Sequence, residues 1–122
     1  MIIAVDFDGV LCENRYPNIG GANKKLIKYL VSEQRSGNKL ILWTCRRGEE
    51  LEQAVDWCKK NGLQFDAVNE NLDFIIESFG GNTRKVFANV YIDDRNADKR
   101  FCAKYNIPFS EPGVESVLPK RF

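Results

Sequence analysis

The sequence of 122 residues contains no histidine. This absence excludes serine–histidine and cysteine–histidine catalytic pairs within the chain, and it also excludes metal sites with histidine ligands. Long apolar runs are missing too, because the first apolar segment already ends at Asp6. That segment is too short for a signal peptide or a membrane span, so we expect a cytoplasmic protein without a membrane partner.

Paired cysteines and a strong net charge are also missing. None of the cysteines forms a Cys-x-x-Cys pair, which argues against a structural zinc site and a disulfide framework, and we expect reduced thiols that mostly fill the core. The four cysteines are Cys12, Cys45, Cys58 and Cys102. The formal net charge of +1 gives no argument for nucleic acid or membrane as an obligatory partner. At this length we expect one domain over residues 1–122.

Short apolar runs alternate with longer amphipathic ones along the chain. This alternation predicts an α/β fold, a Rossmann-like three-layer sandwich whose mostly parallel sheet has helices on both faces. Strands are expected at residues 2–7, 39–44, 65–70 and 86–92, and helices at 23–34, 49–61, 72–79 and 97–105. The last strand is nearly all apolar, which is typical of a strand buried on both faces.

Polar residues recur where three of these strands end. Asp6 and Asp8 follow the first strand, Thr44 follows the second, and Asp93 and Asp94 follow the fourth. In open α/β sheets, ligands bind beyond the carboxyl ends of the strands. Three strands are therefore expected to bring oxygen ligands to one crevice, and this convergence is the main functional signal in the sequence.

The carboxylates in this crevice require a counter-charge. Residues two apart on a strand share a face, so Asp6 and Asp8 should point into the crevice together. With Asp93 and Asp94 beside them, up to four carboxylates cannot all stay ionised without a cation. Oxygen ligands with open positions suit Mg²⁺. The alternative for each site alone is turn formation or helix capping.

Four segments resemble, in order, the motifs of the haloacid dehalogenase superfamily. "DFDGVL" is similar to its first motif and "LILWT" to its second, while "VYIDDRNAD" is similar to the fourth. Lys85 stands where that family carries the lysine of its third motif. The match spans residues 2–98 and is closest in character to small bacterial or phage-type members. The spacing from the lysine to the acid pair resembles that of deoxyribonucleotidases.

The resemblance implies a role for each matching residue. Asp6 would be the nucleophile that forms an aspartyl-phosphate, and Asp8 would act as general acid and then general base. Thr44 and Lys85 would complete the catalytic set by contacting the phosphoryl group. Mg²⁺ would be held by the Asp6 carboxylate, the Asp8 backbone carbonyl and Asp94. The remaining acid, Asp93, would bind the ion through water or support its ligands.

Further residues have two interpretations each. Gly9 would let the chain turn so that backbone N–H groups approach a phosphate. Arg46, and Arg15 in the loop after the first motif together with Tyr16, are candidates for substrate binding, although an ordinary surface ion pair is the alternative for Arg46. Asp98 matches the last acid of the fourth motif and would support the metal ligands, but acids are also common in the first turn of a helix. Arg84 is the alternative to Lys85.

The predicted function is Mg²⁺-dependent phosphomonoester hydrolysis. The gaps between the motifs are too short for a substantial cap domain, which leaves the site open and the substrate undetermined. A nucleoside monophosphate or a phosphorylated nucleic-acid end is expected first, and a sugar phosphate or another small metabolite is the alternative. Two rivals from other classes are an inactive binding module of the same fold and a receiver-like signalling domain.

Overall fold

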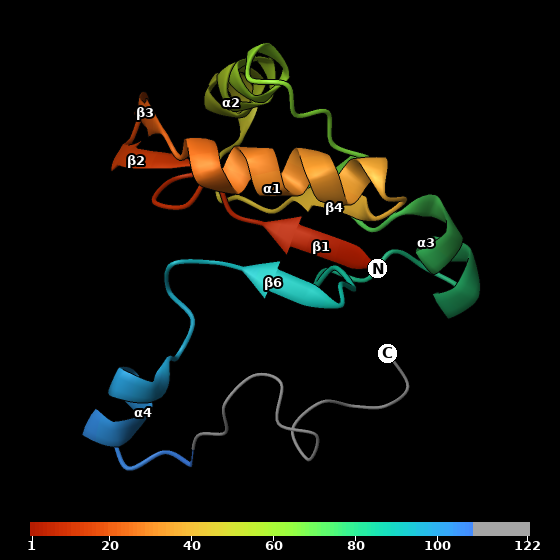
Figure 1. The fold of residues 1–122 in the computed structure, drawn as a ribbon. Coiled ribbons are helices and arrows are strands. Elements are labelled where there is room, and N and C mark those ends of the chain that lie inside the picture. The colour runs from red at the N-terminus through yellow and green to blue at the C-terminus, as the bar shows by residue number, and fades with distance from the viewer. Residues whose placement is uncertain (109–122) are drawn as a thin grey trace.

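The computed structural model describes residues 1–108, which form a parallel four-stranded sheet with helices around it (Figure 1). The strand order is β5–β4–β1–β6, so β1 and β4 lie in the middle of the sheet. The strands are β1 (Ile2–Val5), β4 (Lys39–Leu42), β5 (Ala67–Val68) and β6 (Val90–Ile92). The predicted α/β sandwich with a mostly parallel sheet is confirmed.

Strand β1 is buried on both faces because all its side chains are apolar. Ile3 and Val5 belong to the core on one side of the sheet, and Ile2 and Ala4 belong to the core on the other side. A parallel strand needs such cover on both faces, and its sequence is accordingly a continuous apolar run. The central strands thereby fix the position of whatever follows them in the chain.

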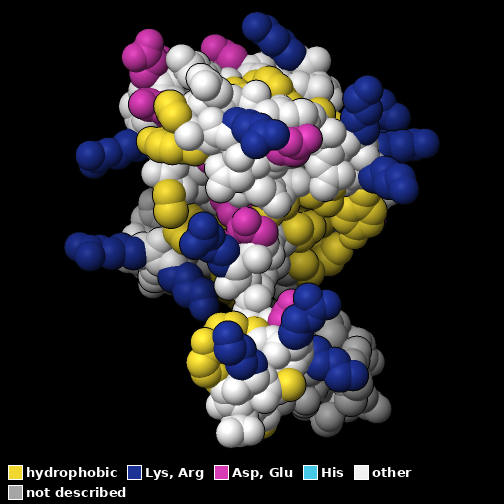
Figure 2. Space-filling model, turned by 90° about the vertical axis from the view of Figure 1, so that its left-hand side faces the viewer, with side chains coloured by type: hydrophobic (Ala, Val, Ile, Leu, Met, Phe, Trp, Pro, Cys, Tyr) yellow, Lys and Arg dark blue, Asp and Glu magenta, His cyan; other side chains and the backbone are white. Residues whose placement is uncertain are grey.

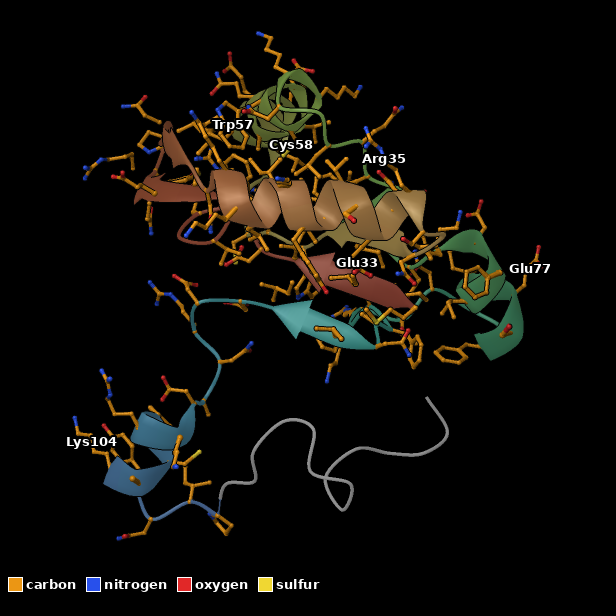
Figure 3. The ribbon with its side chains drawn as sticks, in the orientation of Figure 1. Glu33, Arg35, Trp57, Cys58, Glu77 and Lys104 are labelled. Carbon is orange, nitrogen blue, oxygen red and sulfur yellow. The ribbon has the colours of Figure 1, made fainter. Side chains whose placement is uncertain are left out.

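Helices α1 (Lys24–Arg35) and α2 (Gly48–Lys60) cover one face of the sheet (Figure 1). The Asn23 side chain caps α1, which buries Leu30 in the core. Cys58 of α2 lies on the side that faces α1 and the sheet (Figure 3). Burial raises the pKa of this thiol to about 12, so it fills space as a neutral group. Within residues 1–108 all four cysteines are unpaired.

The other face of the sheet is covered by α3 (Asp73–Phe79) and by a segment that does not form a strand. The predicted strand at 86–92 is wrong for residues 86–89, because only β6 pairs with the sheet. The Phe87 N–H donates instead to the amide oxygen of the buried Asn71 at 2.6 Å. Val86 and Ala88 are apolar because they pack beneath the sheet, not because they join its hydrogen-bond ladder.

A hairpin of β2 (Cys12–Arg15) and β3 (Asn18–Ala22) fills the gap after β1, which the sequence indicated to be too short for a substantial cap domain. Between β4 and β6 the chain forms α2, β5 and α3, so within residues 1–108 no cap domain is present. The short helix α4 (Lys99–Lys104) follows β6. None of the described helices has the length and apolar character needed to cross a membrane. The single-domain prediction includes residues 109–122, which lie outside the described residues.

Candidate functional site

Three strands end at one edge of the sheet, and the residues that follow them form the candidate site. Val5 of β1 pairs with Leu42 of β4 and with Ile92 of β6. The Asp6 N–H then donates to the Ile92 carbonyl at 2.9 Å, which sets Asp6 beside Asp93. Figure 2 looks onto this edge and shows acidic side chains near its middle, with Lys and Arg side chains around them.

Three carboxylates come together at this edge. Asp6, Asp93 and Asp94 each offer an oxygen, and these oxygens all lie within 4.8 Å of one another. Asp6 and Asp93 are half-buried, while Asp94 is exposed. Such a set of oxygen donors fits a small hard cation such as Mg²⁺, which keeps part of its water shell and binds phosphate. Asp8 lines the same pocket but does not belong to this set.

The surroundings of Asp6 disfavour the ionised form of its carboxyl group. Burial, the largest cause, raises the pKa of Asp6 from an ordinary 3.8 to about 6. The negative charges of Asp93 and Asp94 act in the same direction, whereas the 2.7 Å hydrogen bond from the Phe7 N–H favours the ionised form. A cation bound between the acids would relieve this repulsion.

The Asp8 carboxylate faces a buried arginine. Arg46 Nε donates to Asp8 Oδ2 at 2.8 Å, and Arg46 Nη2 donates to Asp8 Oδ1 at 2.7 Å. The hydrogen bond with Asp8 raises the pKa of Arg46, whose guanidinium also lies 4.9 Å from the centre of the Phe7 ring. Both oxygens of Asp8 therefore accept hydrogen bonds from a cation, which does not present this side chain as a proton donor.

Arg46 also holds the hairpin and the start of α2. Its Nη1 donates to the carbonyls of Pro17 and Glu50 at 3.1 and 3.3 Å, and its Nη2 donates to the Asn18 carbonyl at 3.0 Å. Each N–H group of the guanidinium thus has a protein partner. The predicted role of Arg46 in binding substrate is not the role in the structure, because no donor is left for a phosphate.

Gly9 is required by the close approach of Asp94. Its φ of 83° is unfavourable for other residues, and the Asp94 carboxylate occupies the space that a Cβ would fill. The Gly9 N–H donates to the Cys12 carbonyl at 2.9 Å, so this amide is not free for the phosphate that the sequence suggested. The role of Gly9 is therefore to leave room for the Asp94 carboxylate.

Thr44 lines the pocket, and within the described residues 1–108 its hydroxyl proton has no acceptor. Its N–H donates to Asn69 Oδ1 at 2.8 Å, which fixes the backbone after β4. Its hydroxyl oxygen accepts a hydrogen bond from the backbone N–H of Arg46 at 3.1 Å. Since a hydroxyl both accepts and donates, its proton can still be given to a phosphoryl oxygen.

Lys85 does not lie in the pocket with the acids. Its Nζ lies 5.5 Å from the centre of the Tyr91 ring, and it lines a separate hollow beside Phe79. The chain reaches β6 through Asn89, whose N–H donates to the Ile2 carbonyl at the start of β1. Lys85 therefore precedes β6 at the edge of the sheet opposite to the site. Its neighbour Arg84 does not line the acidic pocket either.

Arg15 and Asp98 also have local roles. Arg15 is exposed, pairs with Glu13 at 3.2 Å and does not line the pocket. The residues on either side of Arg15, Asn14 and Tyr16, line the pocket instead. Asp98 caps α4 by accepting the Phe101 N–H at 2.8 Å, which is the helix-cap alternative for this residue.

Several pocket residues were not assigned from the sequence. The pocket has a volume of about 660 Å³. Besides the acids, Thr44, Arg46 and the substrate-binding candidate Tyr16, it is lined by four residues that had no assigned role: Asn14, Trp43, Cys45 and Arg95. Their position in the sequence could have indicated three of them, because Trp43 and Cys45 flank Thr44 and Arg95 follows the acid pair. The 5.1 Å distance from the Arg46 guanidinium to the centre of the Tyr16 ring depends on folding and has no sequence signal.

The chain is similar to a solved structure of a conserved protein coded by a locus of Bacteroides thetaiotaomicron. The two are 39% identical, and the match covers 89% of this chain and 93% of that chain with a TM-score of 0.71. That protein is described as conserved, without a stated activity. No protein-family model and no curated protein matches this chain.

Proposed function

We propose that this chain, which belongs to the same family as the conserved Bacteroides thetaiotaomicron protein, is a Mg²⁺-dependent phosphomonoester hydrolase. The observation that carries the proposal is the group of carboxylate oxygens from Asp6, Asp93 and Asp94, within 4.8 Å of one another beside Thr44. The resemblance of the motifs to haloacid dehalogenase phosphatases supports the same reaction.

The donor set supports Mg²⁺ as the cofactor. Asp6, Asp93 and Asp94 would hold the ion, and all three offer oxygen ligands. When bound, Mg²⁺ would neutralise the carboxylates and polarise the phosphate. Asp93 belongs to this group as fully as Asp94, which favours direct binding over contact through water. A contribution from the Asp8 backbone carbonyl stays a prediction.

Asp6 is the proposed nucleophile. One of its oxygens accepts the Phe7 N–H at 2.7 Å, which orients the carboxylate at the end of β1. The other oxygen would attack phosphorus, forming a new P–O bond while the bond from phosphorus to the ester oxygen breaks. Thr44 would donate its hydroxyl proton in a hydrogen bond to a phosphoryl oxygen. Water would then hydrolyse the aspartyl-phosphate, releasing phosphate and restoring Asp6.

The proton needed by the leaving oxygen sets a limit on the substrates. Asp8 is the proposed acid and base, but both of its oxygens accept hydrogen bonds from Arg46. Asp8 must therefore release at least one of these bonds before it can give a proton to an alcohol. Esters whose leaving group needs no proton, such as 4-nitrophenyl phosphate, are the most suitable first substrates.

The pocket also bears on the class of substrate. Its volume of about 660 Å³ falls within the range of about 300–1,000 Å³ that is usual for pockets of small-molecule ligands. Two aromatic residues, Tyr16 and Trp43, line it, and aromatic side chains are suited to stacking on a flat base. We therefore propose a nucleoside monophosphate or a phosphorylated nucleic-acid end, with sugar phosphates as the alternative.

We also propose a cytoplasmic location. The cysteines among residues 1–108 are free, and free thiols are usual in cytosolic proteins.

One observation argues against a receiver-like signalling domain. Such a domain would need its phosphate-accepting aspartate at the end of the third sheet strand along the chain. In this chain that strand is β5, which is followed by Asn69, and the Asn69 side chain binds the Thr44 N–H. An inactive binding module remains the functional rival, and it would bind Mg²⁺ and phosphate without turnover.

The test is hydrolysis of a panel of phosphate esters with and without Mg²⁺. The panel should contain 4-nitrophenyl phosphate, nucleoside monophosphates, a 5′-phosphorylated oligonucleotide and small sugar phosphates. We expect turnover that is lost in excess chelator and restored by Mg²⁺, and that is lost in Asp6→Asn. Turnover that persists in chelator would contradict the metal, and binding of phosphate without turnover of any ester would favour the inactive module.

A further inference from the structure

Among residues 1–108, the candidate site holds more negative than positive charge, and only one of the arginines in its lining is available to a ligand. Four aspartates and two arginines line the pocket. Arg46 donates all its N–H groups to protein acceptors. A phosphate ester is itself an anion, so a transition state with charge on its phosphoryl oxygens needs a donor that Arg46 cannot supply.

The other arginine of the pocket, Arg95, directly follows the proposed metal ligand Asp94. Its backbone N–H donates to Asp93 Oδ1 at 3.0 Å, which holds the turn after β6 against the acids. The side chain is exposed, and among residues 1–108 it has no hydrogen-bond or ion-pair partner. Because Arg95 lines the pocket that the acids line, its guanidinium can turn toward an anion bound there.

We propose that Arg95 binds the phosphoryl group of the substrate and supplies the positive charge that the resemblance assigned to Lys85. This inference rests on the proposed function. A planar guanidinium can donate two parallel hydrogen bonds to two phosphoryl oxygens, and such charge-assisted hydrogen bonds are stronger than hydrogen bonds between neutral groups. Lys85 cannot take this part in the described arrangement, because it lies in another hollow near Tyr91.

The experiment compares three substitutions that each remove one positive charge. Arg95→Gln tests the proposal, Lys85→Gln tests the rival residue, and Arg47→Gln is the matched control. Arg47 is exposed at the start of α2 and does not line the pocket. The measurements are kcat and KM for 4-nitrophenyl phosphate, the inhibition constant of inorganic phosphate, and Mg²⁺ affinity in the absence of phosphate.

We expect kcat/KM to fall about 100-fold in Arg95→Gln, which is the usual effect of removing one donor to a developing oxyanion. Inhibition by inorganic phosphate should weaken by at least about tenfold, because a charge-assisted bidentate contact is lost. Arg95→Lys should recover part of the loss, since it keeps the charge without the fork of donors. The Lys85 and Arg47 variants should stay within about threefold of wild type, the range of exposed charges that touch no ligand. Mg²⁺ affinity should not fall in any of the three Gln variants, because Asp6, Asp93 and Asp94 are intact.

Failure of this inference can be told apart from failure of the proposed function. If wild type hydrolyses the ester and Lys85→Gln loses activity while Arg95→Gln keeps it, the assignment of Arg95 is wrong and the phosphatase stands. If wild type hydrolyses no ester, the proposed function fails. In that case, calorimetric titration of the Mg²⁺-loaded protein with inorganic phosphate tests whether Arg95 binds phosphate. Equal phosphate affinity in wild type and Arg95→Gln would overturn the proposed role of Arg95.

Discussion

Replacing Asp6 with asparagine should stabilise the metal-free protein while it removes the proposed nucleophile. The substitution removes one negative charge at nearly constant shape, and the new side-chain oxygen can keep the hydrogen bond from the Phe7 N–H, which is 2.7 Å in the wild type. At pH 7.5 the wild-type carboxylate is ionised beside Asp93 and Asp94, although its burial and their charges oppose ionisation. Asparagine carries no charge and avoids that penalty.

The raised pKa of Asp6 fixes the sign and the upper size of the effect. The interval from 3.8 to about 6, at about 1.4 kcal/mol for each pKa unit, corresponds to about 3 kcal/mol. Water reaches the half-buried carboxylate and screens it, so we expect about 1 to 2 kcal/mol. Between about pH 4 and 6 the folded wild type keeps a proton that the unfolded chain has lost, so its free energy of unfolding falls, relative to the variant, as the pH rises through this window.

Urea unfolding in excess chelator measures this difference. The two proteins should have similar free energies of unfolding at pH 4, and Asp6→Asn should be more stable above pH 6. Asp56→Asn, an exposed change on α2, serves as control and should have an effect below about 0.5 kcal/mol. Added Mg²⁺ should stabilise wild type more than Asp6→Asn. A variant less stable than wild type at pH 7.5 in chelator would refute the reasoning.

Three further substitutions test the neighbours of Asp6. Asp8→Asn should destabilise the fold by about 3 kcal/mol in urea unfolding, because it leaves the buried Arg46 guanidinium without its counter-charge. Arg46→Lys should lower kcat for 4-nitrophenyl phosphate by at least about tenfold with little change in Mg²⁺ affinity, because lysine cannot bridge Asp8 and the hairpin at once. A kcat of Arg46→Lys equal to that of the wild type would contradict this prediction. Gly9→Ala should weaken Mg²⁺ binding in calorimetry and destabilise the fold by about 2 kcal/mol, because its φ is 83° and its Cβ would displace Asp94.

The parts of the fold that could be predicted are those with a strong local pattern. Helix α1 was expected at 23–34 and is Lys24–Arg35, because its apolar spacing and the Asn23 cap are both local. The segment at 86–89 was predicted as strand because it is apolar. Its burial comes from packing beneath the sheet, and the hydrogen bond from Phe87 to Asn71 replaces strand pairing. Apolar character alone cannot distinguish these two environments.

The site divides in a similar way. Asp6, Asp93 and Asp94 could be predicted to meet because parallel strands deliver the residues that follow them to one edge. Lys85 precedes its strand, so the same rule applied strictly would have sent it to the opposite edge. The partner of Arg46 is Asp8, distant in the sequence, and the contact needs the register of β1 and β4 together with the hairpin. No local pattern contains that information.

Asp6 and Asp8 illustrate why similar residues two positions apart have different parts. Asp6 lies among carboxylates, so its charge opposes folding of the metal-free protein. Asp8 is paired with the guanidinium of Arg46 from the segment after β4, and the same guanidinium donates to the hairpin that carries Tyr16. A metal site needs ligand carboxylates whose negative charge is not neutralised by the protein itself. The fold can bear this cost in stability because other interactions hold the residues around the site. The Asp8–Arg46 pair supplies such an interaction, and it fixes the wall of the pocket while leaving the Asp6 cluster open to a cation.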